Sequence, residues 1–122
     1  MKLAIVGSTC LEGNADAERA VESVLDRYQP SVVVSGGAPG VDTIAEHAAI
    51  RRGIATEIYR PTRRAWKGPG GYEERNMKIA VACDQLVRIV SSLSTTYGSG
   101  WTRDKAKGMK KDTEEIVIVE WI

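Results

Sequence analysis

The chain has 122 residues, of which 43% are hydrophobic and 27% are charged, and its formal net charge at pH 7 is +1. This length suits one hydrophobic core, and the composition excludes a disordered, collagen-like or disulfide-stapled protein. The near-zero net charge argues against indiscriminate binding to nucleic acids or membrane surfaces, so any anion site must be local. We therefore expect a single domain over residues 1–122.

The two cysteines, Cys10 and Cys83, have no neighbours at metal-ligand spacing, so we predict no metal site. The opening segment MKLAIVGSTC is interrupted by polar residues too early for a signal peptide. No apolar run approaches the ~20 residues that span a bilayer. These features predict a reduced, cytoplasmic protein without a membrane segment.

The first predicted element is an unbroken apolar run at residues 3–6, which is typical of a strand buried on both faces of a parallel sheet. After Asn14, a residue type that caps helices, apolar residues recur at helical spacing as far as Tyr28. Pro30 prevents this helix from continuing, and residues 32–34 form a second unbroken apolar run. The chain therefore begins with a strand, a helix and a strand.

A second helix is predicted from Val41 onward, and Gly53 stands where glycine commonly follows a helix end. The later predicted elements are a weak strand at 55–59, a helix at 72–83, a weak strand at 86–90, a helix at 102–111 interrupted by Gly108, and an unbroken strand at 116–119. Because strands and helices alternate with short connections, we expect an α/β fold. It is a Rossmann-like open parallel sheet of about five strands, with helices on both faces.

Three loops combine glycine with hydroxyl side chains: GSTC from Gly7, SGGAPG from Ser35 and GSGWT from Gly98. The last follows a polar stretch, residues 91–100, that we expect to be a functional loop. In open parallel sheets, ligands bind where such loops lead from strands into helix amino termini. Glycine allows close backbone approach, and a helix amino terminus attracts anions. Three such loops at one rim favour a phosphate site.

The middle loop matches neither of two common nucleotide motifs. A Walker loop needs lysine and then serine or threonine after its last glycine, but Val41 and Asp42 follow Gly40. The dinucleotide fingerprint needs glycine at the position of Ser35. The loop is then either a simple strand-to-helix turn, with Asp42 favouring the helix start, or a different kind of anion site.

The segments SGGAPGVDTIAEHA at 35–48, GST after the first strand, ERN at 74–76 and GSGWT together resemble the SLOG superfamily. This superfamily includes DprA, the LOG phosphoribohydrolases and small YspA-like domains. The resemblance covers nearly the whole chain and is strongest toward the small stand-alone members. It implies a Rossmann-like fold whose glycine-rich loops hold a nucleotide or a nucleotide-derived ligand. Pairing through helices is common in this superfamily, so the resemblance also implies a homodimer.

The three loops and the ERN segment supply the predicted ligand and phosphate contacts. These residues are Gly7, Ser8, Thr9, Ser35, Gly36, Gly37, Ala38, Gly40, Asp42, Arg75, Asn76, Gly100 and Thr102. Two departures from the superfamily stand out. The PGGxGTxxE element of LOG enzymes is absent, which puts base-releasing catalysis in doubt. Thr9 also replaces an arginine that is frequent in the small members.

The segment RPTRRAWKGPGGYEERN, residues 60–76, gathers cations around one tryptophan and includes three glycines that suggest a movable flap. Arginine can bind phosphate through a forked contact, and tryptophan can stack on a base. A solvated basic loop with an anchoring tryptophan explains the same residues. The predicted flap contacts are Arg63, Arg64, Trp66 and Lys67.

The leading hypothesis is a binding protein for a nucleotide or nucleotide derivative, with no other cofactor expected. One alternative is an enzyme that cleaves the N-glycosidic bond of a nucleoside monophosphate, in which Glu73 or Glu74 assists departure of the base. Another is a DprA-like single-stranded nucleic-acid binder that uses Trp66 and the arginines. The missing LOG element disfavours the first alternative, and the low net charge disfavours the second.

Overall fold

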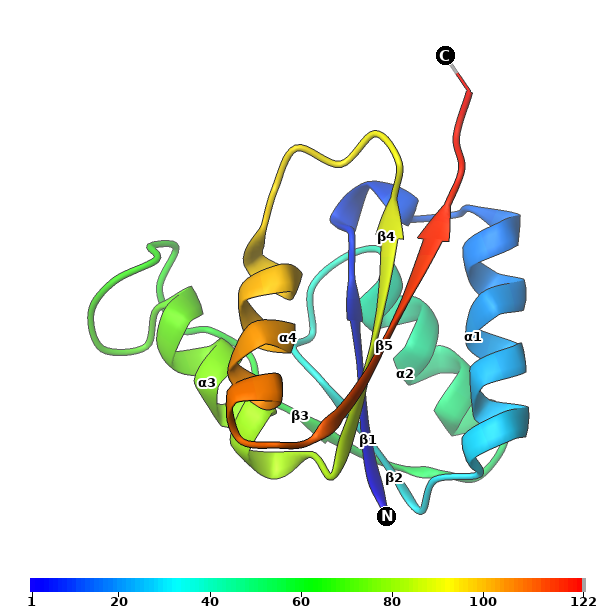
Figure 1. Ribbon diagram of the computed structural model, residues 1–122, viewed down its shortest axis with the longest axis horizontal. Helices are drawn as coiled ribbons and strands as arrows, with labels where there is room; N and C mark the ends of the chain where they lie inside the picture. The colour runs from blue at the N-terminus through cyan, green and yellow to red at the C-terminus, as the bar shows by residue number, and fades with distance from the viewer. Residues whose placement is uncertain (122) are drawn as a thin grey trace.

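The computed structural model describes residues 1–121, in which strands and helices alternate along the chain. The strands are β1 Lys2–Gly7, β2 Val32–Ser35, β3 Ala55–Ile58, β4 Gln85–Ser91 and β5 Asp112–Ile118. The helices are α1 Ala15–Tyr28, α2 Val41–Arg51, α3 Tyr72–Ala82 and α4 Gly98–Gly108, with a short 3-10 helix, η1, at Thr9–Leu11. The five strands are parallel and lie in the order β3-β2-β1-β4-β5 (Figure 1). The predicted Rossmann-like α/β fold is confirmed.

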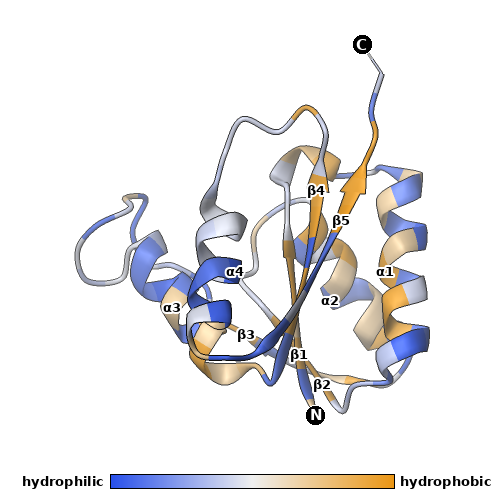
Figure 2. Ribbon diagram, in the orientation of Figure 1, coloured by the Kyte–Doolittle hydropathy of each residue, from blue (hydrophilic) through white to orange (hydrophobic). Residues whose placement is uncertain are grey.

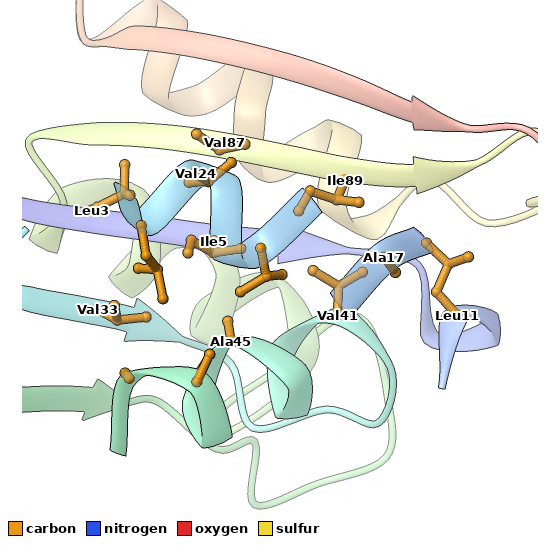
Figure 3. Close-up of a cluster of buried hydrophobic side chains, with 14 of the residues drawn as sticks. Leu3, Ile5, Leu11, Ala17, Val24, Val33, Val41, Ala45, Val87 and Ile89 are labelled. Atoms are coloured by element: carbon orange, nitrogen blue, oxygen red, sulfur yellow. The ribbon is translucent and has the colours of Figure 1, made fainter. Parts of the chain in front are cut away.

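Helices cover both faces of the sheet because side chains alternate along each buried strand. On β1, Leu3 and Ile5 point to the face covered by α1 and α2, and they pack with Val24 and Ala45 (Figure 3). The next residues, such as Ala4, point to the face covered by α3 and α4. Hydrophobic residues dominate the central strands, and hydrophilic residues are interspersed along the helices (Figure 2). The unbroken apolar runs in the sequence reflect this two-sided burial.

The last strand differs from its prediction. It begins at Asp112 rather than at residue 116, and it lies at the edge of the sheet, paired with β4. The Val117 and Val119 side chains are 52% and 57% exposed, so this run is not buried on both faces. An edge strand tolerates charged side chains that face solvent. The acidic residues in the first half of β5 therefore hid the start of the strand from the search for apolar runs.

The boundaries of two other elements also differ from the sequence-based expectation. Helix α4 begins at Gly98, so the end of the expected loop at 91–100 is already helical, and Gly108 closes the helix rather than interrupting it. The 3-10 helix at Thr9–Leu11 was not predicted. Glycine and serine have weak helix propensity, so tertiary packing decides the start of α4.

The sheet topology creates a crevice at one end of the molecule. Strand β1 pairs with β2 on one side and with β4 on the other, so the chain proceeds in opposite directions from β1. Such a switch point separates the loops at the carboxyl ends of the two strands and leaves room for a ligand. Within residues 1–121, no helix is both long enough and apolar enough to cross a membrane.

Candidate functional site

A cavity of about 560 Å³ lies at this switch point, a volume within the usual range for small-molecule sites. Its wall comes from the end of β1, the SGGAPG turn, the flap and the first turns of α3 and α4. The lining residues are Val6, Gly7, Thr9, Gly37, Ala38, Pro39, Asp42, Pro61, Trp66, Tyr72, Arg75, Asn76, Ile79, Thr96, Gly98, Ser99 and Thr102. Segments that are far apart in the sequence therefore meet around one space.

About half of the predicted site residues line this cavity. The predicted residues that line it are Gly7, Thr9, Gly37, Ala38, Asp42, Trp66, Arg75, Asn76 and Thr102. The predicted residues outside its wall are Ser8, Ser35, Gly36, Gly40, Gly100, Arg63, Arg64, Lys67, Glu73 and Glu74. Most members of the second group have structural partners that explain their presence.

Backbone N–H groups in and just after the SGGAPG turn donate hydrogen bonds to acceptors within the chain. The Gly37 N–H donates to the Ser35 hydroxyl at 3.3 Å, and the Ala38 N–H donates to the Asp42 carboxylate at 3.2 Å. The Val41 N–H donates to the Ser8 carbonyl at 3.3 Å. These three N–H groups therefore have internal acceptors, and an aspartate from the turn's own helix lies at the helix start.

The remaining residues of the first and second loops hold the loops together. The Ser8 hydroxyl is buried and accepts a hydrogen bond from the Ser91 N–H at 3.0 Å, which ties the loop after β1 to β4. The Ser35 hydroxyl donates to the buried Glu46 carboxylate at 2.6 Å. At Gly40, a Cβ would lie 2.4 Å from the Ser8 carbonyl oxygen, so glycine permits the two loops to pack.

Arg75 is the basic side chain in the cavity wall, and helix α3 positions it. Its Nη1 donates to the Gly36 carbonyl at 2.5 Å, and its Nε donates to the Asn76 side-chain oxygen at 2.7 Å. Within residues 1–121, Nη2 makes no hydrogen bond. The guanidinium also lies 5.6 Å from the centre of the Tyr72 ring. Burial lowers the pKa of Arg75, with the negative charge of Asp42 acting in the opposite direction.

Asp42 is the acidic residue in the cavity wall and is only 6% exposed. Burial raises the pKa of Asp42 to about 7, although the hydrogen bond from the Ala38 backbone and the positive charge of Arg75 lower it. Nearby Glu46 raises it further. This carboxyl therefore exchanges its proton near neutral pH, which is unusual for an aspartate.

The amino terminus of α4 supplies a further part of the wall, through Gly98, Ser99 and Thr102. The residue before the helix, Tyr97, makes no side-chain capping bond, so the first N–H groups of α4 lack the usual cap. The Gly98 carbonyl accepts hydrogen bonds from Thr102 Oγ1 at 3.0 Å and from Asn76 Nδ2 at 3.5 Å. Asn76 thus links the Arg75 segment directly to this helix start.

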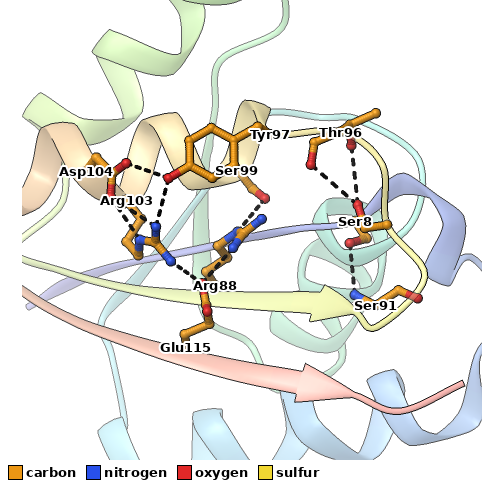
Figure 4. A network of polar contacts seen from close by, with 10 residues as sticks. Ser8, Arg88, Ser91, Thr96, Tyr97, Ser99, Arg103, Asp104 and Glu115 are labelled. Atoms are coloured by element: carbon orange, nitrogen blue, oxygen red, sulfur yellow. Dashed lines mark hydrogen bonds and ion pairs between the residues drawn. The ribbon is translucent and has the colours of Figure 1, made fainter.

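A buried arginine on β4 also holds the start of α4 in place. Arg88 reaches from β4 and donates to the Ser99 hydroxyl at 2.9 Å and to the Glu115 carboxylate at 2.6 Å (Figure 4). Arg103 of α4 pairs with the same carboxylate, and the Tyr97 hydroxyl donates to Asp104 at 2.7 Å. This network holds α4 against β4 and β5. Gly100 fits it, because a Cβ there would overlap the Tyr97 ring.

The flap meets the cavity through its tryptophan, while its cations face solvent. Trp66 lines the cavity and packs edge-on against Trp101 of α4, with ring centres 5.2 Å apart. Arg63, Arg64 and Lys67 are exposed. The structure therefore gives no direct cavity contact to three of the four predicted flap residues.

The two glutamates proposed as catalytic acids point elsewhere. Glu73 accepts a hydrogen bond from Lys67 at 2.8 Å, and Glu74 accepts one from the Gly70 N–H at 3.1 Å. Glu74 also lies 3.5 Å from the Lys78 ammonium. Neither glutamate lines the cavity, whereas Asp42 does.

Some cavity residues were missed by the sequence analysis, notably Tyr72, Ile79, Pro61 and Thr96. Tyr72 and Ile79 lie three residues before and four residues after Arg75, so helical spacing places all three on one face of α3. That spacing was available in the sequence. Pro61 and Thr96 carried no comparable signal, because both lie in irregular segments.

A family profile matches residues 1–66, which is more than half of the chain and includes the first two loops of the site. The chain belongs to the YspA, cpYpsA-related SLOG family. The predicted resemblance is thereby confirmed. A search of curated proteins finds no match to this SLOG chain.

The SLOG fold is also seen in a solved structure, DNA processing protein A (DprA) from Streptococcus pneumoniae. That structure superposes with a TM-score of 0.73 at 24% sequence identity. The match covers 93% of this chain and 49% of the DprA chain, so this chain spans about half the length of DprA. The similarity shows a shared fold.

Proposed function

We propose that this SLOG protein binds a phosphorylated nucleoside, or a derivative of one, in the cavity at the β1–β4 switch point. The observation that carries the proposal is Arg75. Its guanidinium lies in the wall of a ligand-sized cavity, and two neighbouring acceptors hold it in place through Nε and Nη1. SLOG membership agrees with a nucleotide-related role in general terms.

The phosphate is best placed between Arg75 and the amino terminus of α4. The two internal bonds of Arg75 leave both N–H groups of Nη2 for a ligand, and the N–H groups of Gly98 and Ser99 belong to a helix start without a side-chain cap. A helix amino terminus carries about half a positive charge, and charge-assisted hydrogen bonds to phosphate are strong. The phosphate therefore belongs at the third predicted loop rather than at the SGGAPG turn.

Other residues of the cavity wall suit a planar, largely apolar group. Trp66 and Tyr72 supply aromatic surface there, and Val6 and Ile79 supply aliphatic surface. Aromatic side chains stack on nucleobases without strong preference for one base. A cation and aromatic surface in one cavity is the combination expected for a nucleotide site.

Calorimetric titration tests the proposal with a panel of nucleoside 5′-monophosphates and the matching nucleosides. The monophosphate should bind at least tenfold more tightly, a difference of ~1.4 kcal/mol. Arg75→Ala should weaken monophosphate binding by about tenfold to a hundredfold, since one charge-assisted contact contributes ~1.5–3 kcal/mol. Arg63→Ala is the matched control, because Arg63 is an exposed arginine outside the cavity. Equal affinities for phosphorylated and unphosphorylated ligands would contradict the proposal.

Cleavage of the N-glycosidic bond is a second candidate, and Asp42 is the observation that favours it. A buried carboxyl with a pKa of about 7 can donate or accept a proton at neutral pH. Incubation with the same monophosphates, followed by chromatography, measures release of the free base. Turnover that Asp42→Asn abolishes and Glu73→Gln preserves would establish the enzyme. Binding without base release would establish the binding protein.

Nucleic-acid binding is a third candidate, favoured by the exposed Arg63 and Arg64 and by the fold shared with a DNA processing protein. Fluorescence anisotropy with a labelled single-stranded oligonucleotide tests it. Affinity that falls steeply with salt and with Arg63→Ala would support this candidate. The predicted homodimer is tested separately by light scattering coupled to size-exclusion chromatography.

A further inference from the structure

Asp42 is a buried carboxyl that faces the ligand cavity and that the proposed phosphate site does not use. It stands in the first turn of α2, where the Ala38 N–H donates to its Oδ2 at 3.2 Å and the Gly36 backbone adds a weaker stabilisation of the carboxylate. Asp42 lines the cavity, and within residues 1–121 no side chain donates a hydrogen bond to its carboxylate. The carboxylate therefore retains acceptor capacity at the cavity wall.

Arg75 lies close to Asp42, but among residues 1–121 the two side chains do not form an ion pair. Both groups lie over Gly36: a Cβ at that glycine would be 2.6 Å from Arg75 Nη1 and 2.8 Å from Asp42 Oδ2. Gly36 thus provides the room that the two side chains occupy. The cavity wall presents a cation and a carboxyl side by side, each with bonding capacity left.

We propose that Asp42 hydrogen-bonds a sugar hydroxyl of the ligand, so that with Arg75 it selects a ribose phosphate over a deoxyribose phosphate. The inference rests on the proposed function, because it concerns the same cavity and assumes that Arg75 holds the phosphate. In a ribose 5-phosphate, hydroxyls and phosphate are separated by a few bonds. One such unit can therefore satisfy both neighbouring side chains.

A hydroxyl is the group that suits Asp42 in both of its protonation states. It donates to the ionised carboxylate and accepts from the protonated carboxyl, whereas a phosphate oxygen is repelled by the ionised form. The pKa of about 7 means that both forms are present at neutral pH. A ligand without the hydroxyl leaves a buried polar group without a partner, and such losses produce strong discrimination.

The test compares ligands that share one base and one phosphate. A ribonucleoside 5′-monophosphate is titrated beside its 2′-deoxy, 3′-deoxy and 2′,3′-dideoxy counterparts at pH 7. We expect the dideoxy compound to bind at least tenfold more weakly than the ribonucleotide. One of the two monodeoxy compounds should account for most of that loss and so identify the hydroxyl.

Variants then assign the discrimination to Asp42. Asp42→Ala should reduce the ribo-to-dideoxy affinity ratio to near one. The matched control is Glu46→Gln, which changes a buried acid one turn further along α2 that bonds Ser35 and lies outside the cavity wall. Glu46→Gln should leave the ratio unchanged. Circular dichroism shows which variants are folded, and the wild-type ratio decides the matter if Asp42→Ala does not fold.

The outcomes separate this inference from the proposed function. Equal affinities of the wild-type protein for ribo and dideoxy monophosphates would overturn the inference while leaving nucleotide binding intact. A large ratio that persists in folded Asp42→Ala would also overturn it. Failure of every monophosphate to bind would overturn the proposed function and the inference with it.

Discussion

Gly40→Ala tests directly whether the SGGAPG turn serves to pack two loops together. Gly40 has φ +83° and ψ −130°, a backbone conformation that side chains disfavour. An added Cβ would lie 2.4 Å from the Ser8 carbonyl oxygen and 2.7 Å from the Thr9 Cα. Both obstacles are backbone atoms, so the loop after β1 must move. The substitution therefore strains the chain and separates two loops of the site.

The expected loss in free energy of unfolding is about 2–6 kcal/mol, because backbone strain of ~1–3 kcal/mol acts together with overpacking of about 1–3 kcal/mol. Gly53→Ala is the control. Gly53 also has a positive φ, +70°, but a Cβ there meets nothing within 4 Å. This control should lose only the conformational part, roughly 1–2 kcal/mol.

Urea denaturation of both variants measures the difference, with unchanged slopes confirming that the unfolded states are comparable. Gly40→Ala should also weaken nucleotide binding, because Thr9 lines the cavity and moves with its loop. Equal destabilisation by the two substitutions would refute the claim that Gly40 is required for loop packing. Weakened binding without any loss of stability would instead show that the turn contacts the ligand directly.

Three further predictions concern stability. The pKa of Asp42 is about 7 in the folded protein against an ordinary 3.8, so the folded state holds this proton more tightly; its contribution to stability falls as pH rises from 4 to 7. Asp42→Asn should therefore gain stability relative to wild type as the pH rises from 4 to 7, as thermal unfolding would show, and a constant difference would contradict this. Arg88→Met should lose about 1–3 kcal/mol in urea denaturation, because it removes a buried ion pair while Glu115 stays partly solvated; no loss would mean that the pair is neutral. Gly108→Ala should raise the unfolding free energy by about 0.5–1 kcal/mol, since this helical glycine has open space around it, and a lower melting temperature would count against that geometry.

Much of the fold could be predicted because its signals are local. The run at residues 3–6 and the helical spacing between Asn14 and Tyr28 each reflect burial of neighbouring residues, and both elements were found. Asn14 indeed caps α1 by accepting a hydrogen bond from the Ala17 N–H at 2.9 Å. The signal failed at α4, whose glycine-rich start is helical because distant residues hold it.

The candidate site was predictable as a set of loops but not as a set of contacts. The sequence by itself determined that glycine-rich loops stand at the carboxyl ends of parallel strands, because strand order along the chain and turn composition are local properties. Tertiary structure alone decided which donors remain for a ligand. The Ala38 N–H bonds Asp42, and Arg75 keeps Nη2 free only because Gly36 and Asn76 occupy its other donors. An N–H group that bonds an internal acceptor is not available to a ligand. Which donors remain for a ligand is therefore known only once the whole chain is folded.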